Sequence, residues 1–123
     1  MKKPKFAHKS DRTAAEAAEP FDTAEEAWFW AMSCLVARED GARFVAGLGL
    51  QERPCSPDDL IVSAERMGAS GRLKPPHLRV LAGYGRRLLA PDRRARGERK
   101  AARLWDEALD LLTTVWRRKG IVA

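Results

Sequence analysis

The sequence predicts an all-α protein, a small single-domain bundle of about four helices. Ala, Leu, Arg and Glu, which favour helix, are abundant, whereas the β-branched and aromatic residues that strands prefer are scattered. The 123 residues are 45% hydrophobic, which provides apolar material for one core at a length that suits one domain. Residues 1–20 hold almost no large apolar side chains, so we expect a flexible basic tail there and a helical domain over residues 21–123.

The first predicted helix begins at Asp22 or Thr23, since each is followed three residues later by a glutamate that can complete a capping box. It ends near Asp40, where Gly41 provides the left-handed residue that commonly follows a helix. Its apolar face is broad, which predicts that this helix is the central one. That face consists of Trp28, Phe29, Ala31, Met32, Leu35 and Val36.

The next segment, residues 42–55, contains two glycines and a short apolar run. We expect a loop or one short helical turn, with a strand over residues 43–46 as the alternative. A second helix then has a clear start, because Ser56 can cap it and Pro57 takes the first helical position, where a missing N–H is harmless. Glycines after its apolar stripe end it by Gly71.

The third predicted helix starts at Pro75 or Pro76 and reaches about Leu89. Helical periodicity gives it an apolar packing face made of Leu78, Leu81, Ala82, Gly85 and Leu88. The arc that faces away from this core carries Arg79, Arg86 and Arg87. The last predicted helix spans about Arg93 to Lys119, and its first half is nearly devoid of large apolar side chains. We expect that half to face solvent or to be ordered by a polyanion.

Positive charge is concentrated in one stretch of the chain. The net charge is +6, yet residues 72–103 alone carry +9, while residues 21–71 carry −5. A local field of one sign attracts polyanions, whereas a mixed surface does not. The stretch is therefore the best clue to function that the sequence offers.

The second and third predicted helices, joined by a turn that contains glycine, suggest a helix-turn-helix whose second helix would enter the major groove. The turn is longer than the three or four residues typical of that motif. We predict a nucleic-acid-binding protein, either a small DNA-binding transcriptional regulator or a phage- or nucleoid-type accessory factor, with RNA as an open alternative. The predicted binding residues are Arg72, Lys74, Arg79, Arg86, Arg87, Arg93, Arg94, Arg96, Arg99, Lys100 and Arg103.

A protein-binding adaptor is the second hypothesis. The basic stretch would then dock on an acidic partner, such as a component of the transcription machinery. The helix that carries Trp28 and Leu35 would form the interface with that partner or with a second copy of the chain. The pair Trp28 and Trp30 is more typical of a core or a dimer interface than of a ligand cage.

An enzyme is the least favoured class, and we predict no catalytic residues and no cofactor. The only histidines are His8 and His77, and with Cys34 and Cys55 they lack the paired spacing of a metal site, so no metal ion is predicted. The carboxylates near Asp106 suit the polar face of a helix better than general acid and base catalysis.

The sequence contains no apolar run of the roughly 18 to 20 residues that span a bilayer. Its first residues are basic but lack the apolar segment of a secretory signal. We therefore expect no membrane association and a cytoplasmic location. Two cysteines are too few for a disulfide scaffold, and both are expected to be free thiols.

Overall fold

A computed structural model of the chain describes residues 18–41 and 52–123. In chain order these residues form α2 (Ala24–Glu39), α3 (Pro57–Ala69), α4 (Pro75–Arg87), a short 3₁₀ turn η1 (Arg96–Glu98) and α5 (Arg99–Arg118). In the described ranges the β-structure is limited to an isolated bridge between Phe21 and Val122. The predicted all-α bundle is confirmed.

Parts of two predicted segments lie outside the described residues. These are most of the basic tail predicted over residues 1–20 and the loop or strand predicted from residue 42 onward. Within the described residues, no helix is both long and apolar enough to cross a membrane.

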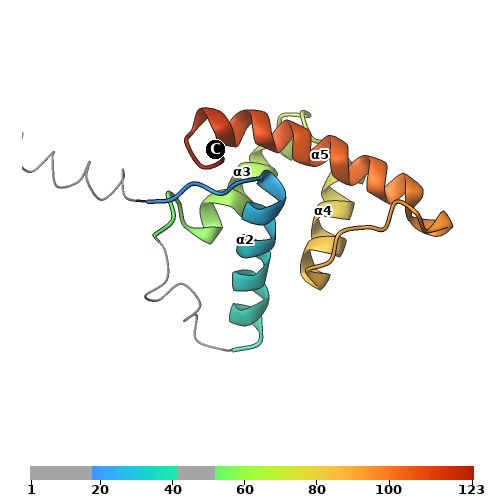
Figure 1. Ribbon diagram of the computed structural model, residues 1–123, viewed down its shortest axis with the longest axis horizontal. Coiled ribbons are helices and arrows are strands. Elements are labelled where there is room, and N and C mark those ends of the chain that lie inside the picture. The colour runs from blue at the N-terminus through green and yellow to red at the C-terminus, as the bar shows by residue number, and fades with distance from the viewer. Residues whose placement is uncertain (1–17, 42–51) are drawn as a thin grey trace, which may run out of the picture.

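The long helix α5 lies across the other helices, and α2 and α4 extend from it on the same side (Figure 1). The central position predicted for the first helix is confirmed, because α2 packs against α3, α4 and α5. One hydrophobic cluster draws side chains from all four helices. Its largest fully buried members are Trp105, Trp116, Phe21, Leu60, Leu73, Leu81 and Leu112.

Two helices begin with the predicted side-chain caps. The hydroxyl of Thr23 accepts a hydrogen bond from Glu26 N–H at 3.1 Å and starts α2. At the start of α3, Ser56 and Asp59 each accept a hydrogen bond from the other's backbone N–H, which forms a complete capping box. Pro57 occupies the first position of that helix, as predicted.

The C-terminal ends of the helices share a left-handed residue. Gly41, Gly71 and Gly120 follow α2, α3 and α5 with φ angles of 80°, 84° and 78°. In α4 the equivalent residue is Leu88, with φ 55°. Glycine adopts this conformation without the Cβ clash that other residues suffer, so α4 alone ends in a conformation that its residue disfavours.

The crossing of α2 and α4 depends on Gly85. The indole N–H of Trp28 donates a hydrogen bond to the carbonyl oxygen of Leu81, one turn earlier on α4, at 2.9 Å. A Cβ at residue 85 would lie 2.7 Å from Nε1 of Trp28 and 2.9 Å from Cγ of Met32. The missing side chain therefore makes room for the tryptophan that joins the two helices.

The residues after α5 fold back under the start of α2. Phe21 N–H donates to the Ile121 carbonyl, and Ala123 N–H donates to the Phe21 carbonyl, both at 2.9 Å. Phe21, Ile121 and Val122 are all buried. The sequence did not indicate this contact, because neither segment has a regular periodicity that would mark it as core.

The predicted apolar face of α4 was partly wrong. Leu81 and Gly85 are buried as expected, but Ala82 and Leu88 are exposed and His77 is buried instead. The face is rotated because Trp28 packs at Gly85. In addition, the helix ends at Arg87, so Leu88 leaves the helical spiral.

The predicted start of the last helix at Arg93 was also wrong, because α5 begins at Arg99. The preceding residues form turns in which Asp92 N–H donates to the Glu98 carboxylate and Arg94 N–H donates to the Asp92 carboxylate. These side chains compete with the helix for backbone groups, as aspartate commonly does near helix starts. This segment has few apolar side chains, so packing against the core does not stabilise a helix there.

Replacing Gly85 with alanine should lower the free energy of unfolding by about 2 kcal/mol or more, because the new methyl group displaces Trp28 and leaves its indole N–H without a partner. Gly83, on the same helix, is the matched control, since a Cβ there meets no atom within 4 Å. Gly83→Ala should raise stability by roughly 0.5–1 kcal/mol. Urea unfolding followed by tryptophan fluorescence measures both. Equal effects from the two substitutions would contradict the assigned role of Gly85.

Leu88→Gly should stabilise the protein by about 1 kcal/mol, because it relieves a left-handed conformation at a non-glycine residue. The side chain it removes is 46% exposed, so little burial is lost. Thermal unfolding monitored by circular dichroism measures the change. A lower Tm for Leu88→Gly would show that the contacts of this leucine outweigh its backbone strain.

Candidate nucleic-acid interface

The predicted binding residues are all exposed and come from three consecutive parts of the structure. The turn between α3 and α4 holds Arg72 and Lys74, and α4 holds Arg79, Arg86 and Arg87. The third part, residues 88–103, includes the connector from α4 to α5 and the first turns of α5. It carries Arg93, Arg94, Arg96, Arg99, Lys100 and Arg103.

The connector, residues 88–98, runs from the C-terminal end of α4 back to the start of α5 (Figure 1). It is fastened to α5 by Arg93, whose guanidinium donates two hydrogen bonds to the Asp106 carboxylate at 2.9 and 3.3 Å. These hydrogen bonds raise the pKa of Arg93 above its ordinary value. Arg93 therefore has a structural partner. Its neighbours Arg94 and Arg96 form no ion pair with a carboxylate of the described residues.

Arg86 is also engaged within the protein. Its guanidinium binds both carboxylate oxygens of Glu39, at the end of α2, at 2.7 and 2.9 Å. The hydrogen bonds from Arg86 hold the pKa of Glu39 below its ordinary value. Both side chains are about half exposed, so solvent screens the pair and Arg86 can exchange Glu39 for another anion.

Arg87 lies on a different side of α4 from Arg86. Its guanidinium sits over the ring of Tyr84, 5.0 Å from the centroid, and Tyr84 in turn meets the edge of Trp105 on α5. The contacts of Arg86 therefore direct it toward α2, and those of Arg87 direct it toward α5. The three arginines predicted to share one arc of α4 are exposed as expected, but two of them diverge.

Most of the predicted binding residues carry an uncompensated charge. In the described part of the chain, only Arg86 and Arg93 of the eleven have a carboxylate within ion-pair distance. The free cations are Arg72, Lys74, Arg79, Arg87, Arg94, Arg96, Arg99, Lys100 and Arg103. Exposed cations without internal partners are available to phosphate groups at little desolvation cost.

The exposed face of α4 combines charge with small side chains. Ala82 and Gly83 are exposed between Arg79 and Arg86, and a Cβ on Gly83 would meet no protein atom within 4 Å. The turn before α4, residues 70–74, is pinned by Leu73, whose side chain is fully buried. This arrangement holds α4 firmly against the core while its outer face stays open to a close approach.

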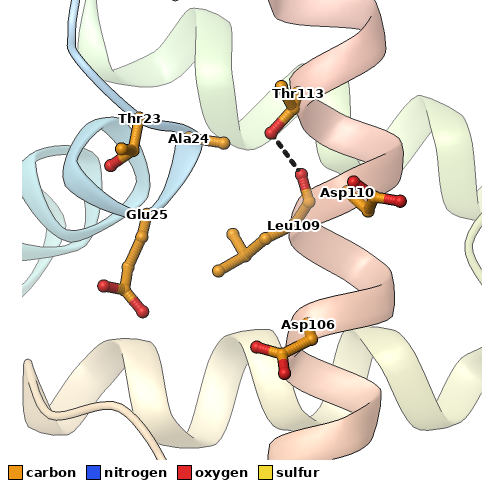
Figure 2. A pocket seen from close by; sticks show the side chains of 7 residues that line it. All are labelled: Thr23, Ala24, Glu25, Asp106, Leu109, Asp110 and Thr113. Carbon is orange, nitrogen blue, oxygen red and sulfur yellow. Dashed lines mark hydrogen bonds between the residues drawn. The ribbon is translucent and has the colours of Figure 1, made fainter.

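A shallow pocket of about 280 Å³ lies between the start of α2 and the middle of α5 (Figure 2). Three of its lining residues are acidic, namely Glu25, Asp106 and Asp110. Glu25 accepts a hydrogen bond from the indole N–H of Trp105 at 2.8 Å, and Asp106 holds Arg93. Glu25 and Asp106 therefore have structural roles in this pocket.

The candidate metal ligands of the sequence are dispersed in the structure. His77 accepts a hydrogen bond from Lys74 N–H on Nδ1 and lies 3.0 Å from the Glu107 carboxylate through Nε2, so both ring nitrogens are occupied. Cys34 and Cys55 are free thiols, as predicted. Among the described residues, no three His, Cys, Asp or Glu side chains are grouped so that they could hold a metal ion.

The aromatic helix proposed as a partner interface mainly serves the protein's own core. Trp28 is 4% exposed, and its ring stacks against Trp116 at 6.4 Å between centroids. Trp30 and Leu35 are only partly buried, and Trp30 packs against Phe21 at 5.1 Å. Contact with a second chain through α2 would therefore involve Trp30 and Leu35 rather than Trp28.

Comparison of the chain with protein-family models, curated protein sequences and solved structures gave no match.

Sequence reasoning missed the partners of the basic residues. Asp106 was placed on the polar face of a helix and Glu39 was given no role, with no indication that they meet Arg93 and Arg86. The sequence separations of these pairs are 47 and 13 residues, so helical spacing could not reveal them. Sequence reasoning also missed that Leu88 and Leu89 are exposed at the end of α4.

Cys55 should be poorly reactive at neutral pH. Burial, with a smaller effect from Asp59, raises the pKa of its thiol to about 11 from 9.0. Such a thiol is roughly 0.1% ionised at pH 8, against about 10% for one with the ordinary pKa of 9.0. In a Cys34→Ala variant at pH 8, Cys55 should react with iodoacetamide roughly 100-fold more slowly in the folded protein than in denaturant. Raising the pH toward 11 should remove this difference in rate. Equal rates at pH 8 would contradict the raised pKa.

Proposed function

We propose that the protein binds nucleic acid, with duplex DNA as the favoured target, and acts as a small regulator or accessory factor of a nucleic-acid process. The observation that carries the proposal is the set of nine exposed cations on the turn, α4, the connector and the start of α5 that lack an ion-pair partner in the described residues.

The separation of charge over the molecule supports this proposal. Residues 18–41, which include α2, carry six acidic side chains and one basic side chain, whereas residues 86–103 carry eight basic and two acidic. A polyanion is attracted to the second region and repelled by the first. The same charge distribution gives the protein a defined orientation as it approaches DNA.

The basic residues divide into two roles under this proposal. The cations of the connector and the first turns of α5 contact phosphates, which gives affinity without sequence preference. Arg79 and Arg86 flank the small side chains of α4 and are suited to reach base edges in a groove. Arg86 would exchange Glu39 for the nucleic acid.

Binding should weaken steeply as salt is added. Neutralising about six phosphates gives a slope near −5 for log K against log salt concentration. Titration of a labelled 30-base-pair duplex at several salt concentrations, followed by fluorescence anisotropy, measures the slope. The absence of binding at about 50 mM salt would overturn the proposal, since electrostatic attraction is strong under that condition.

Variants separate the two roles. Replacing Arg94, Arg96 and Arg99 with alanine should reduce the slope by about 3 and weaken binding to all sequences alike. The matched control is Arg118→Ala with Lys119→Ala, at the opposite end of α5, where both residues are exposed. A control that weakens binding as much as the connector variant would place the contact elsewhere.

The role of α4 has its own test. Gly83→Glu places a carboxylate on the open face without a clash in the free protein, because the site of the new Cβ is empty. It should reduce binding severely and leave the fold intact, while Gly83→Ala should bind as the wild type does. Wild-type affinity in Gly83→Glu would exclude α4 from the interface.

A further inference from the structure

Two adjacent leucines protrude from the surface at the end of α4. Leu88 is 46% exposed and Leu89 is 66% exposed, which makes Leu89 the most exposed large hydrophobic side chain of the described residues. Single exposed apolar residues are common on protein surfaces. Two in succession, held by a defined backbone motif, require a more specific explanation.

The backbone at this point is well ordered by hydrogen bonds. Leu88 N–H donates to the Gly85 carbonyl at 3.0 Å, and Leu89 N–H donates to the Tyr84 carbonyl at 3.3 Å. These two bonds form the Schellman motif that closes many helices. They fix Leu88 and Leu89 in one position at the end of the helix.

Two other helices end in the same motif, with glycine as the left-handed residue and a buried side chain soon after it. α5 ends with Gly120 in the left-handed position, and the next residue, Ile121, is buried. At the end of α3, Gly71 takes the same position; the next residue, Arg72, is exposed but charged, and the buried Leu73 follows it. In α4 the left-handed residue is a leucine, and the residue after it is exposed. Neither the backbone nor burial explains the two leucines.

Their surroundings in the chain are strongly basic. Arg86 and Arg87 come directly before them, and Arg93 and Arg94 follow on the connector. Exposed leucines beside arginines are complementary to a ligand in which anionic groups flank an apolar surface. In duplex DNA, phosphates line the grooves and the faces of the stacked bases lie between them.

We propose that Leu88 and Leu89 form an apolar wedge that inserts between base pairs of DNA and kinks the duplex. This inference rests on the proposed nucleic-acid binding and extends it to a second kind of contact. Leucine is among the side chains that architectural proteins insert in this way. Both side chains are exposed, and they follow the last turn of α4 directly after Arg86 and Arg87.

The expected energetic signature differs from that of the arginines. Insertion removes apolar surface from water but neutralises no phosphate, so it contributes affinity without changing the dependence on salt. The kink adds a change in the shape of the DNA, which cations contacting phosphates along a straight duplex do not produce.

The experiment compares wild-type protein with the double variant Leu88→Gly and Leu89→Ser. Its matched control is Val62→Ser, which removes the other exposed large hydrophobic side chain in the described residues, on α3. A 30-base-pair duplex labelled at both ends reports bending by energy transfer, and anisotropy at several salt concentrations reports affinity and slope. Thermal unfolding of each variant shows that it is folded.

We expect the double variant to bind at least about tenfold more weakly with the same salt slope, and to lose most of the bend, while Val62→Ser behaves as the wild type. Because Leu88→Gly relieves strain, the loss of binding should accompany an unchanged or higher Tm. A double variant that binds and bends DNA as the wild type does would overturn the wedge while leaving the proposed function standing. A wild-type protein that does not bind DNA would overturn both.

Discussion

The contact of Trp28 with Gly85 fixes the geometry of the whole molecule. The indole N–H reaches the Leu81 carbonyl only because residue 85 has no side chain, and the ring behind it stacks on Trp116 of α5. Trp116 in turn donates its own N–H to the hydroxyl of Ser63 on α3 at 3.0 Å. One chain of contacts thus joins all four helices, and it sets the rotation of α4 about its axis. That rotation decides which of the side chains of α4 face solvent.

The rotation of α4 also determines how its positive charges are used. Adjacent residues on a helix point about 100° apart, so Arg86 and Arg87 leave α4 in different directions. With α4 held by Trp28, Arg86 reaches Glu39 of α2 and Arg87 rests on Tyr84 beside α5. The two adjacent arginines at the end of α4 therefore have different neighbours, and the exposed Leu88 and Leu89 follow them directly in the chain.

Local signals in the sequence predicted much of the fold, because they depend on neighbouring residues. Ser56 with Pro57 marked the start of α3, and Gly41 marked the end of α2, since a cap and a left-handed stop need only their own backbone. The positions that were wrong depend on distant parts of the chain. Ala82 was assigned to the core because helical angles alone do not show that Trp28 packs at Gly85. The charge of the candidate site was evident in the sequence, but its pairing with Glu39 and Asp106 was not.

The internal partners of the arginines imply an order of events in the proposed binding. Apart from Arg93, which holds Asp106, the cations of the connector and of the first turns of α5 have no ion pair to break, so they meet an approaching polyanion first. Arg86 must exchange its two hydrogen bonds with Glu39 for contacts with the nucleic acid, which happens only when α4 is already close. Glu39 also repels phosphates once Arg86 turns away from it, and so it opposes binding in any orientation that brings α2 toward the duplex. The carboxylate at the end of α2 thereby favours an approach in which α4 and the connector, rather than α2, face the nucleic acid.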